Sequence, residues 1–277
     1  MSQWAAFVGL TGFLVTALLL LSRLSQRTLS DRGRGPTAAT DGVHGAGLGS
    51  RDRTYPRFET AEAVRQRRHL RRQLSTDELS TGALLANVAL TQGLFGVLVV
   101  GGAFFFEIPP SALGITDAAL STGLPAVALG VAAGVGFWVG NELAAAAADG
   151  VGIAVDESLR ELLAPDSLGG WVVLVGVVLP TIAIVEELLF RAAAIGVPVA
   201  GLGAPAWAMV LLSSIAFALG HGAQGRVGIA VTGALGLALG ALFVLTESLL
   251  AVVVAHYCIN AFELVVHEGI GISRPRL

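Results

Sequence analysis

The stretch WVVLVGVVLPTIAIVEELLFRAAAI, residues 171–195, decides the fold of this chain. An α-helix of this length crosses the hydrocarbon core of a bilayer, which is about 30 Å thick. Inside this apolar run lie Glu186, Glu187 and Arg191. An ionisable side chain at the bilayer centre costs roughly 2.5–3.5 kcal/mol even on the lenient insertion scales. We therefore expect a membrane-spanning helix whose charged residues face the interior of a helical bundle and satisfy one another there.

Composition extends this conclusion to the whole chain. Hydrophobic residues make up 54% of the sequence and charged residues only 13%, with a mean hydropathy of +0.75. Soluble domains carry roughly 25% charged residues. The sequence predicts an all-α, polytopic transmembrane helical bundle with about seven spans. Besides 171–195, the apolar runs that mark these spans are 3–21, 82–106, 123–147, 204–220, 227–245 and 248–266.

The charges divide the chain into three predicted regions. An N-terminal transmembrane helix at 1–21 lacks a positive leader and a small-residue cleavage site, so we expect it to be retained. A cytoplasmic, Arg-rich linker follows at 22–80 and is expected to be partly disordered. The multi-span domain occupies 81–277 and carries its site motifs between 186 and 260. Within the linker, residues 59–74 form either a helix on anionic lipid or, as we favour, a solvated segment that only sets topology.

Arginine distribution predicts the orientation. Twelve of the 17 arginines lie between Arg23 and Arg72, and the chain contains no lysine. By the positive-inside rule this segment is cytoplasmic, which puts the N-terminus outside and, with seven spans, the C-terminus inside. We therefore expect a multi-pass protein of the cell membrane whose partners are the lipid bilayer and a peptide or membrane-protein substrate, with no nucleic acid.

Two classes of chemistry are excluded or disfavoured by composition. Cys258 is the single cysteine, which excludes an intramolecular disulfide and a cysteine-based zinc cluster. It lies two residues from His256 and is expected to point away from the site, as a packing residue. Residues 273–277 form no prenylation box, so the chain is not expected to be a prenylated substrate itself.

Three pairs of residues, each spaced i, i+4 in a different predicted span, are the candidate site. Glu187 and Arg191 have the favourable order for a helical ion pair. Glu186 points about 100° away from Glu187 and must face another partner. The other two pairs, each sharing one helix face, are Phe217 with His221 and His256 with Asn260.

Together these side chains provide the groups needed to hydrolyse a carbonyl compound. Glu186 can activate a water molecule, and His221 and His256 can orient that water, donate protons or hold a metal. Asn260 and a histidine can donate hydrogen bonds to a developing oxyanion. Each motif alone is a weak signal, but three motifs in separate spans are much more specific.

The three motifs, E-E-x-x-x-R at 186–191, F-x-x-x-H at 217–221 and H-x-x-x-N at 256–260, resemble the signature of the CPBP family. These are the type II CAAX prenyl proteases and bacteriocin-processing enzymes, a group of intramembrane glutamic endopeptidases. The resemblance covers residues 171–266, roughly the last third of the chain. The N-terminal span and the Arg-rich linker are not part of this pattern.

The resemblance implies a role for each residue of the motifs. Glu186 would be the base that activates water, and Glu187 with Arg191 would be a supporting pair. His221 would assist the water, while His256 and Asn260 would form the oxyanion site. No cofactor is favoured. Zinc is the alternative, with Glu186, His221 and His256 as ligands, although the chain has no H-E-x-x-H helix.

A second function class stays open from the residues alone. A non-catalytic scaffold, or a proton- or ion-transport-like protein, would also place ionisable groups inside a bundle. Such a path needs polar groups leading toward both membrane faces. We find no matching polar residue in the second span, which favours the enzyme. Substrate identity, including whether the substrate is lipidated, is not encoded in a recognisable motif.

The remaining polar and special residues receive structural interpretations. Polar residues near the ends of spans are expected to lie at the interface or beyond it: Asn141, Glu142, Glu263, His267 and Glu268. Gly236 and Gly240 have GxxxG spacing, which predicts close packing against a neighbouring helix. Pro180 is expected to kink the span that carries Glu186.

Overall fold

The computed structural model describes residues 3–32, 81–150 and 158–272, and within these ranges the chain is helical without strands. The predicted helix at 59–74 and most of the Arg-rich linker lie outside the described residues. The α-helices are α1 (Trp4–Arg32), α3 (Thr81–Phe105), α4 (Ala119–Thr122), α5 (Leu124–Gly150), α6 (Ser158–Leu163), α7 (Leu168–Val173), α8 (Leu179–Glu187), α9 (Val197–Leu202), α10 (Ala206–Gly220), α11 (Gly225–Thr246) and α12 (Leu249–Leu264).

Several short segments depart from α-helical geometry. Two are 3₁₀ turns, η1 (Pro110–Leu113) and η4 (Gly222–Gln224), and three are π-helical, η2 (Leu174–Val178), η3 (Leu188–Gly196) and η5 (Val265–Ile270). Two of the π-helical segments flank α8, so that α7, η2, α8, η3 and α9 form one continuous helical length, Leu168–Leu202. Pro180, where we predicted a kink, is the second residue of α8 and lies two residues after the end of η2.

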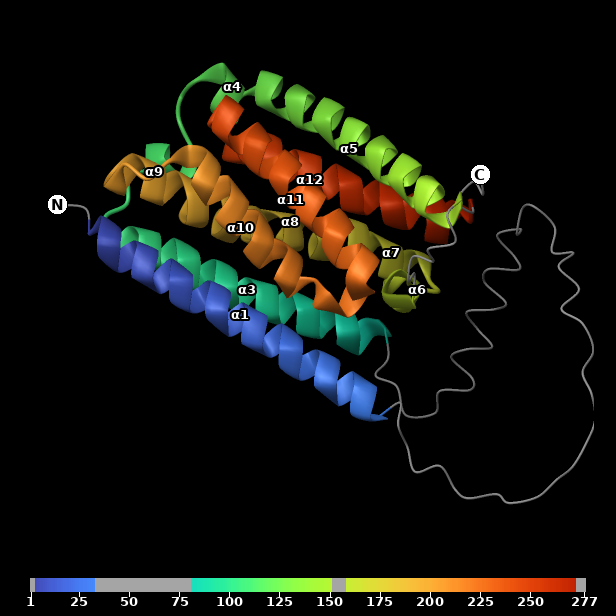
Figure 1. Ribbon diagram of the computed structural model, residues 1–277. Coiled ribbons are helices and arrows are strands. Elements are labelled where there is room, and N and C mark those ends of the chain that lie inside the picture. Colours follow the sequence, from blue (N-terminus) through green and yellow to red (C-terminus); the bar gives the residue numbers. More distant parts are fainter. Residues whose placement is uncertain (1–2, 33–80, 151–157, 273–277) are drawn as a thin grey trace, which may run out of the picture.

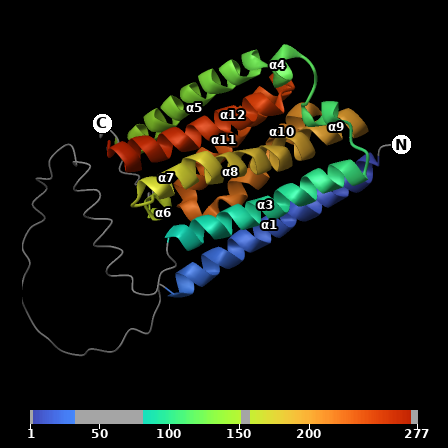
Figure 2. The same cartoon turned by 180° about the vertical axis from the view of Figure 1, so that it is seen from behind.

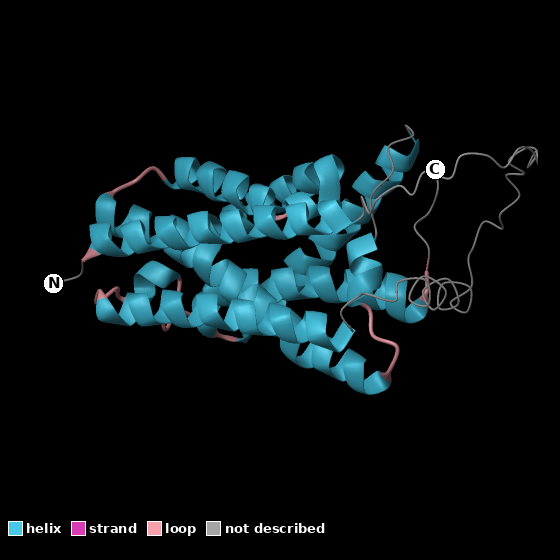
Figure 3. Cartoon of the chain, turned by 90° about the horizontal axis from the view of Figure 1, so that it is seen from below, coloured by secondary structure: helices cyan, strands magenta, loops and turns pink. Residues whose placement is uncertain are grey.

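The long helices form one bundle (Figures 1 and 2). On one side α1 and α3 lie side by side, and on the other α5 lies along α12, while α8, α10 and α11 lie between these pairs. Figure 3 shows the same bundle from below as an arrangement of helices joined by short loops. The C-terminal ends of α1 and α12, the N-terminal end of α3 and α6 lie at one end of the bundle.

The predicted fold class is confirmed. Among the described residues, six helical lengths are long and apolar enough to cross a membrane: Trp4–Leu24, Thr81–Phe105, Leu124–Ala148, Leu168–Leu202, Gly222–Thr246 and Leu249–Ile270. The seventh predicted span corresponds to α10, whose 15 residues are shorter than the others. Helix α10 stops because His221 leaves helical geometry, with φ −96° and ψ 21°.

The surface of the bundle is apolar. Large hydrophobic side chains are strongly exposed, among them Phe104 at 89%, Leu124 at 84% and Leu168 at 82%. An apolar surface of this extent is incompatible with water and marks contact with another apolar phase. Together with the helix lengths, it shows a multi-pass protein in contact with the lipid bilayer.

Glycines bring the helices into close contact. As predicted, Gly236 and Gly240 on α11 face α10: a Cβ at Gly240 would lie 2.9 Å from Val210 Cγ1. The sequence analysis overlooked a second pair, Gly130 and Gly134 on α5. A Cβ at either of them would lie within 2.8 Å of a backbone carbonyl oxygen of α12. At these glycine notches, where no side chain separates the helices, the backbones approach closely, as they do at small residues in membrane bundles.

The N-terminal helix is an integral part of this bundle. Helix α1 extends to Arg32, whereas we predicted a linker from residue 22; residues 22–32 contain no Gly or Pro, and the first is Gly33. Ser22 Oγ donates to Gly220 O at 2.7 Å, next to the end of α10. A Cβ at Gly201 would lie 2.2 Å from the Trp4 ring. Helix α1 therefore packs on the bundle at Trp4 and again at Ser22, and the second contact lies next to His221.

Candidate active site

A buried carboxylate, Glu187, organises the centre of the bundle. Its Oε1 accepts a hydrogen bond from Arg191 Nη1 at 2.8 Å, one turn further along the same helix. The same oxygen lies 2.6 Å from Nδ1 of His256 on α12. Both Glu187 and Arg191 are almost completely buried. The ion pair expected from the i, i+4 spacing is present, and in addition it anchors a histidine from another helix.

Arg191 is held from three directions. Besides its bond to Glu187, its Nη2 donates to Gly236 O at 3.3 Å. Its guanidinium carbon lies 4.5 Å from the centre of the Phe217 ring, a cation–π arrangement. The absence of a side chain at Gly236 therefore serves two purposes, since it admits α10 and exposes a carbonyl to the arginine.

Glu186 points to a different set of partners, as the 100° step along the helix requires. Its Oε1 accepts a hydrogen bond from Nε2 of Gln92 on α3 at 3.0 Å. Its Oε2 lies 3.8 Å from His256 Nε2 and 4.0 Å from His221 Nε2. These separations are too long for a direct hydrogen bond and suit one bridging water molecule. Among the described residues, Oε2 has no hydrogen-bond partner.

Hydrogen bonds fix how both imidazoles are oriented. His221 Nδ1 lies 2.8 Å from the Phe217 carbonyl oxygen, which can only accept, so this nitrogen carries the proton. His256 Nδ1 faces Glu187 in the same way and donates to it when the carboxylate is ionised. In a neutral imidazole the other nitrogen, Nε2, then has a free lone pair. Both rings therefore present Nε2 to Glu186.

Phe217 is an apolar residue of the site and packs against both histidine rings. Its ring centre lies 4.5 Å from that of His221 and 6.1 Å from that of His256. Burial decreases from Phe217 outward: the His256 side chain is 4% exposed, Glu186 10% and His221 27%. The site is therefore most accessible at His221, where α10 ends.

The structure brings six of the seven predicted residues into direct contact or within 4.0 Å of one another. These are Glu186, Glu187, Arg191, Phe217, His221 and His256. The seventh, Asn260, follows His256 by one turn of α12 and is half-buried. Its amide makes no hydrogen bond to any described residue. The chemical roles of these residues stay predictions.

Gln92 was missed by the sequence analysis. We argued that the second span holds no matching polar residue, and that was wrong, because Gln92 on α3 bonds directly to Glu186. The available signal was an amide in the middle of an apolar run. Its partner could not be inferred, because the contact joins residues 94 positions apart.

The donor atoms of Glu186, His221 and His256 can be compared with the coordination geometry of zinc. Each histidine donates Nδ1–H to an oxygen and presents Nε2 to the site, which is the usual arrangement of zinc-binding histidines. Two ligand atoms on one tetrahedral zinc are about 3.4 Å apart, given bonds of about 2.0–2.1 Å. The measured separations from Glu186 Oε2, 3.8 and 4.0 Å, are slightly wider. The residue types fit zinc, and Glu186, His221 and His256 would be its ligands, but their donor atoms are spread too widely as they stand: among the described residues only Glu142, Glu263 and His267 place such atoms within 4.8 Å of one another.

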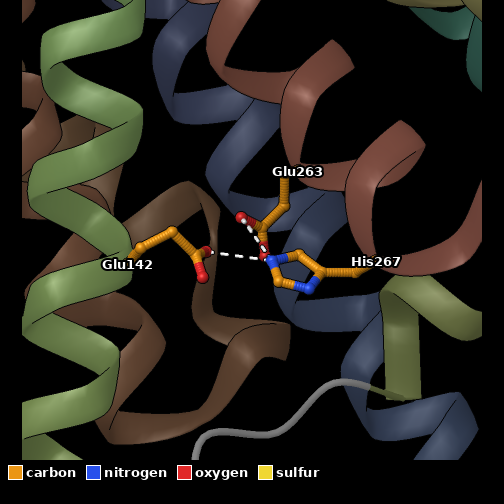
Figure 4. Close-up of side chains that lie close together, drawn as sticks. All are labelled: Glu142, Glu263 and His267. Atoms are coloured by element: carbon orange, nitrogen blue, oxygen red, sulfur yellow. Dashed lines mark hydrogen bonds and ion pairs between the residues drawn. The ribbon is translucent and has the colours of Figure 1, made fainter. Parts of the chain in front are cut away.

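A second polar cluster lies at the end of the bundle near α6 (Figure 4). His267 Nε2 lies 3.0 Å from Glu142 Oε1 on α5 and 3.9 Å from Glu263 Oε2 on α12. Its Nδ1 donates to Ile272 O at 2.7 Å. We expected these residues to be interfacial or beyond the membrane; in the structure His267 and Glu268 are buried between helices. Helix α5 lies along α12, so their polar ends meet.

Arg160 gives this second cluster a structural explanation. Its Nη1 lies 2.7 Å from Glu263 Oε1, and its Nε lies 3.0 Å from Glu268 Oε1. Asn141 Nδ2 also donates to Glu263, at 3.5 Å. The three ligand-type residues are close enough for a metal, with ligand atoms within 4.8 Å of one another. Because a guanidinium already binds Glu263, we interpret the cluster as an ionic tie between α5, α6 and α12.

The fold and the first cluster together define a class: a membrane-embedded helical bundle with a buried carboxylate–imidazole site. Residues 168–262 match the family described as type II CAAX prenyl endopeptidase Rce1-like. This confirms the family resemblance over that part of the chain and supports a CAAX-type intramembrane endopeptidase in general. All the predicted site residues lie inside the matched region, whereas α1, α3 and α5 lie outside it. No curated protein and no solved structure matches the chain.

Proposed function

We propose that the protein hydrolyses peptide bonds in the membrane by a glutamate-activated water, without a metal. One observation carries this proposal: Glu186 Oε2 lies 3.8 and 4.0 Å from the Nε2 atoms of two histidines supplied by different helices. A water held between these three atoms would contact a base and two imidazoles at once. This is the geometry that a general-base hydrolysis requires.

The reaction proceeds in two proton transfers. Glu186 Oε2 takes a proton from water while the water oxygen bonds to the scissile carbonyl carbon, which gives a tetrahedral oxyanion. The C–N bond then breaks, the carbonyl re-forms, and Glu186 returns the proton to the leaving amine. His221 orients the water, while His256 and the Asn260 amide donate to the oxyanion. For His256 to donate through Nε2, that nitrogen must carry a proton in addition to the one that Nδ1 donates to Glu187.

The substrate we propose is a peptide or the tail of a membrane protein that reaches the site from the end of α10. The half-exposed position of His221 supports entry there. The match to prenyl endopeptidases makes lipidated C-terminal peptides the first class to test. We further propose, from the arginine distribution, that this side is cytoplasmic and the N-terminus is outside. A proton or ion path on the same bundle is the competing function.

The decisive experiment uses purified protein in liposomes with a fluorogenic CAAX-type peptide, farnesylated and unmodified. We expect Glu186→Gln, His221→Ala and His256→Ala to abolish cleavage. Asn260→Ala should keep a remnant, since one lost oxyanion donor costs about 100- to 1000-fold in turnover. Cys258→Ala should be nearly silent. Full activity of Glu186→Gln would refute the proposal, and cleavage of neither peptide by the wild type would favour the transport-like function.

A chelator separates the two chemical mechanisms. With the metal-free mechanism, chelation leaves hydrolysis unchanged while Glu186→Gln removes it. If activity is lost with the chelator and returns with zinc, then Glu186, His221 and His256 are ligands, in accordance with the orientation of both Nε2 atoms toward Glu186.

A further inference from the structure

We propose that Gln92 is a positioning residue of this active site, supplied by α3 from outside the family domain. The proposal rests on the function proposed for Glu186. Gln92 would hold the Glu186 carboxylate by one oxygen, so that the other oxygen stays directed at the histidines. It would act through Glu186 and not on the substrate.

The contact itself has a defined direction. A carboxylate oxygen can only accept, so the amide nitrogen of Gln92 must be the donor in the 3.0 Å contact to Glu186 Oε1. This leaves Oε2 as the oxygen that faces His221 and His256. Hydrogen bonds to charged groups are stronger than neutral ones. One such bond is enough to select a single carboxylate orientation.

The packing of α3 on α8 sets the distance of this contact. Gly96 lies one turn after Gln92, and a Cβ there would lie 2.9 Å from Cγ2 of Val185, the residue before Glu186. On the same face of α3, Phe95 and Val99 are buried in the main core. The absence of a side chain at Gly96 therefore allows α3 to approach α8 at the level of Glu186.

The carbonyl end of Gln92 is a second unusual feature. Its Oε1 is buried and has no hydrogen-bond partner among the described residues. A buried, unpaired amide oxygen costs free energy, so a side chain that served packing alone would be better replaced by an apolar one. The bond to Glu186 gives the chain a reason to keep an amide in this position.

If Gln92 is a positioning residue, its substitution should lower kcat and leave KM unchanged. Gln92→Met keeps the length of the side chain and removes the donor. We expect kcat to fall roughly 10- to 100-fold, the range for one hydrogen bond to a charged group. KM and the melting temperature should stay near the wild-type values, because the substrate is not contacted and α3 stays packed. If Gln92→Met is not recovered, Gln92→Asn, which is too short to reach Glu186, carries the same expectation.

Two controls on α3 isolate the effect. Asn87→Leu removes an exposed amide five residues earlier and should leave kcat unchanged. Val99→Ala loosens the buried face of α3 without touching Glu186. If Val99→Ala lowers kcat as much as Gln92→Met, or if Gln92→Met lowers the melting temperature to the same extent, Gln92 is merely structural.

The two proposals fail in different ways. An unchanged kcat in Gln92→Met, with Glu186→Gln inactive, overturns the role of Gln92 and leaves the proposed function standing. A fully active Glu186→Gln protein overturns the proposed function, and with it the reason for holding that carboxylate.

Discussion

At the residue scale, two adjacent glutamates have opposite environments. Glu187 binds a guanidinium and an imidazole through one oxygen, because Arg191 and His256 share its Oε1, while its Oε2 is buried without a hydrogen bond to the described residues. Glu186 accepts from Gln92 through Oε1, and its Oε2, also without a hydrogen bond to the described residues, lies near Nε2 of His221 and His256. The difference follows from the 100° rotation between neighbours on a helix, which directs one carboxylate toward the guanidinium and the other toward two imidazoles. We therefore expect Glu187 to be a structural group and Glu186 to be the one available for chemistry.

Removal of the arginine tests this division. Arg191→Ala leaves the Glu187 carboxylate buried without its cation, and breaking a buried pair in this way costs roughly 3–5 kcal/mol. We expect a lower melting temperature in detergent, lower expression and loss of activity. Glu186→Gln should abolish activity with the melting temperature unchanged. Arg226→Ala, which removes an exposed arginine, is the matched control. A stable and fully active Arg191→Ala protein would contradict the structural role.

At the scale of elements, helices approach closely where a glycine faces the neighbouring helix. Helix α5 packs along α12 through Gly130 and Gly134, and α11 packs on α10 through Gly236 and Gly240. Helix α12 begins at a capped end, where Ser248 Oγ accepts from Ala251 N at 3.0 Å. These contacts fix the position of α12 relative to its neighbouring helices, and therefore the position of His256 in the bundle.

A methyl group on α5 should disturb this packing. In Gly134→Ala the new Cβ would lie 2.7 Å from Cys258 Cβ and 2.8 Å from Ala255 O, and the backbone oxygen cannot move cheaply. Overpacking of this kind costs about 1–3 kcal/mol. We expect a lower melting temperature, together with reduced activity through displacement of His256.

Gly136→Ala provides the comparison on the same helix. A Cβ at Gly136 has nothing within 4 Å, so this variant should be neutral or slightly stabilised by the better helix propensity of alanine. Equal melting temperatures for the two variants would show that the packing of α5 on α12 does not require the absence of a side chain at Gly134.

At the scale of the whole molecule, apolar and polar side chains lie in three separate zones. Apolar side chains cover the surface, the candidate active site lies inside the bundle, and the ionic cluster around Arg160 lies at one end. The exposed arginine Arg226 begins α11, near the end of α10. On the exterior side of the predicted topology lies the connection between α3 and α5, which contains Asp117.

Cysteine labelling can test the predicted orientation. In a Cys258→Ala background, single cysteines at Asp117 and Arg226 replace exposed residues. With a membrane-impermeant maleimide on intact cells, we expect labelling at position 117 and none at 226. Permeabilisation should make position 226 reactive. The reverse pattern would invert the topology and place the entrance at His221 on the outer side of the membrane.

The amino-acid sequence alone determined the fold class and the local geometry of the site. Apolar runs long enough to cross a bilayer predicted the helices, because a backbone in lipid must satisfy its hydrogen bonds internally. The spacing of Glu187 and Arg191, of Phe217 and His221, and of His256 and Asn260 predicted which side chains share a helix face. These are short-range properties of one helix, and the periodicity of 3.6 residues is enough to derive them.

Tertiary structure alone decided which faces meet and at what depth. The bond of Gln92 to Glu186, the contact of His256 with Glu187 and the cluster of Glu142, Glu263 and His267 each join residues far apart in the sequence. Such contacts depend on how one helix slides and rotates against another. That register is set by the sum of many weak packing contacts and glycine notches across the bundle, and no local pattern in the chain encodes it.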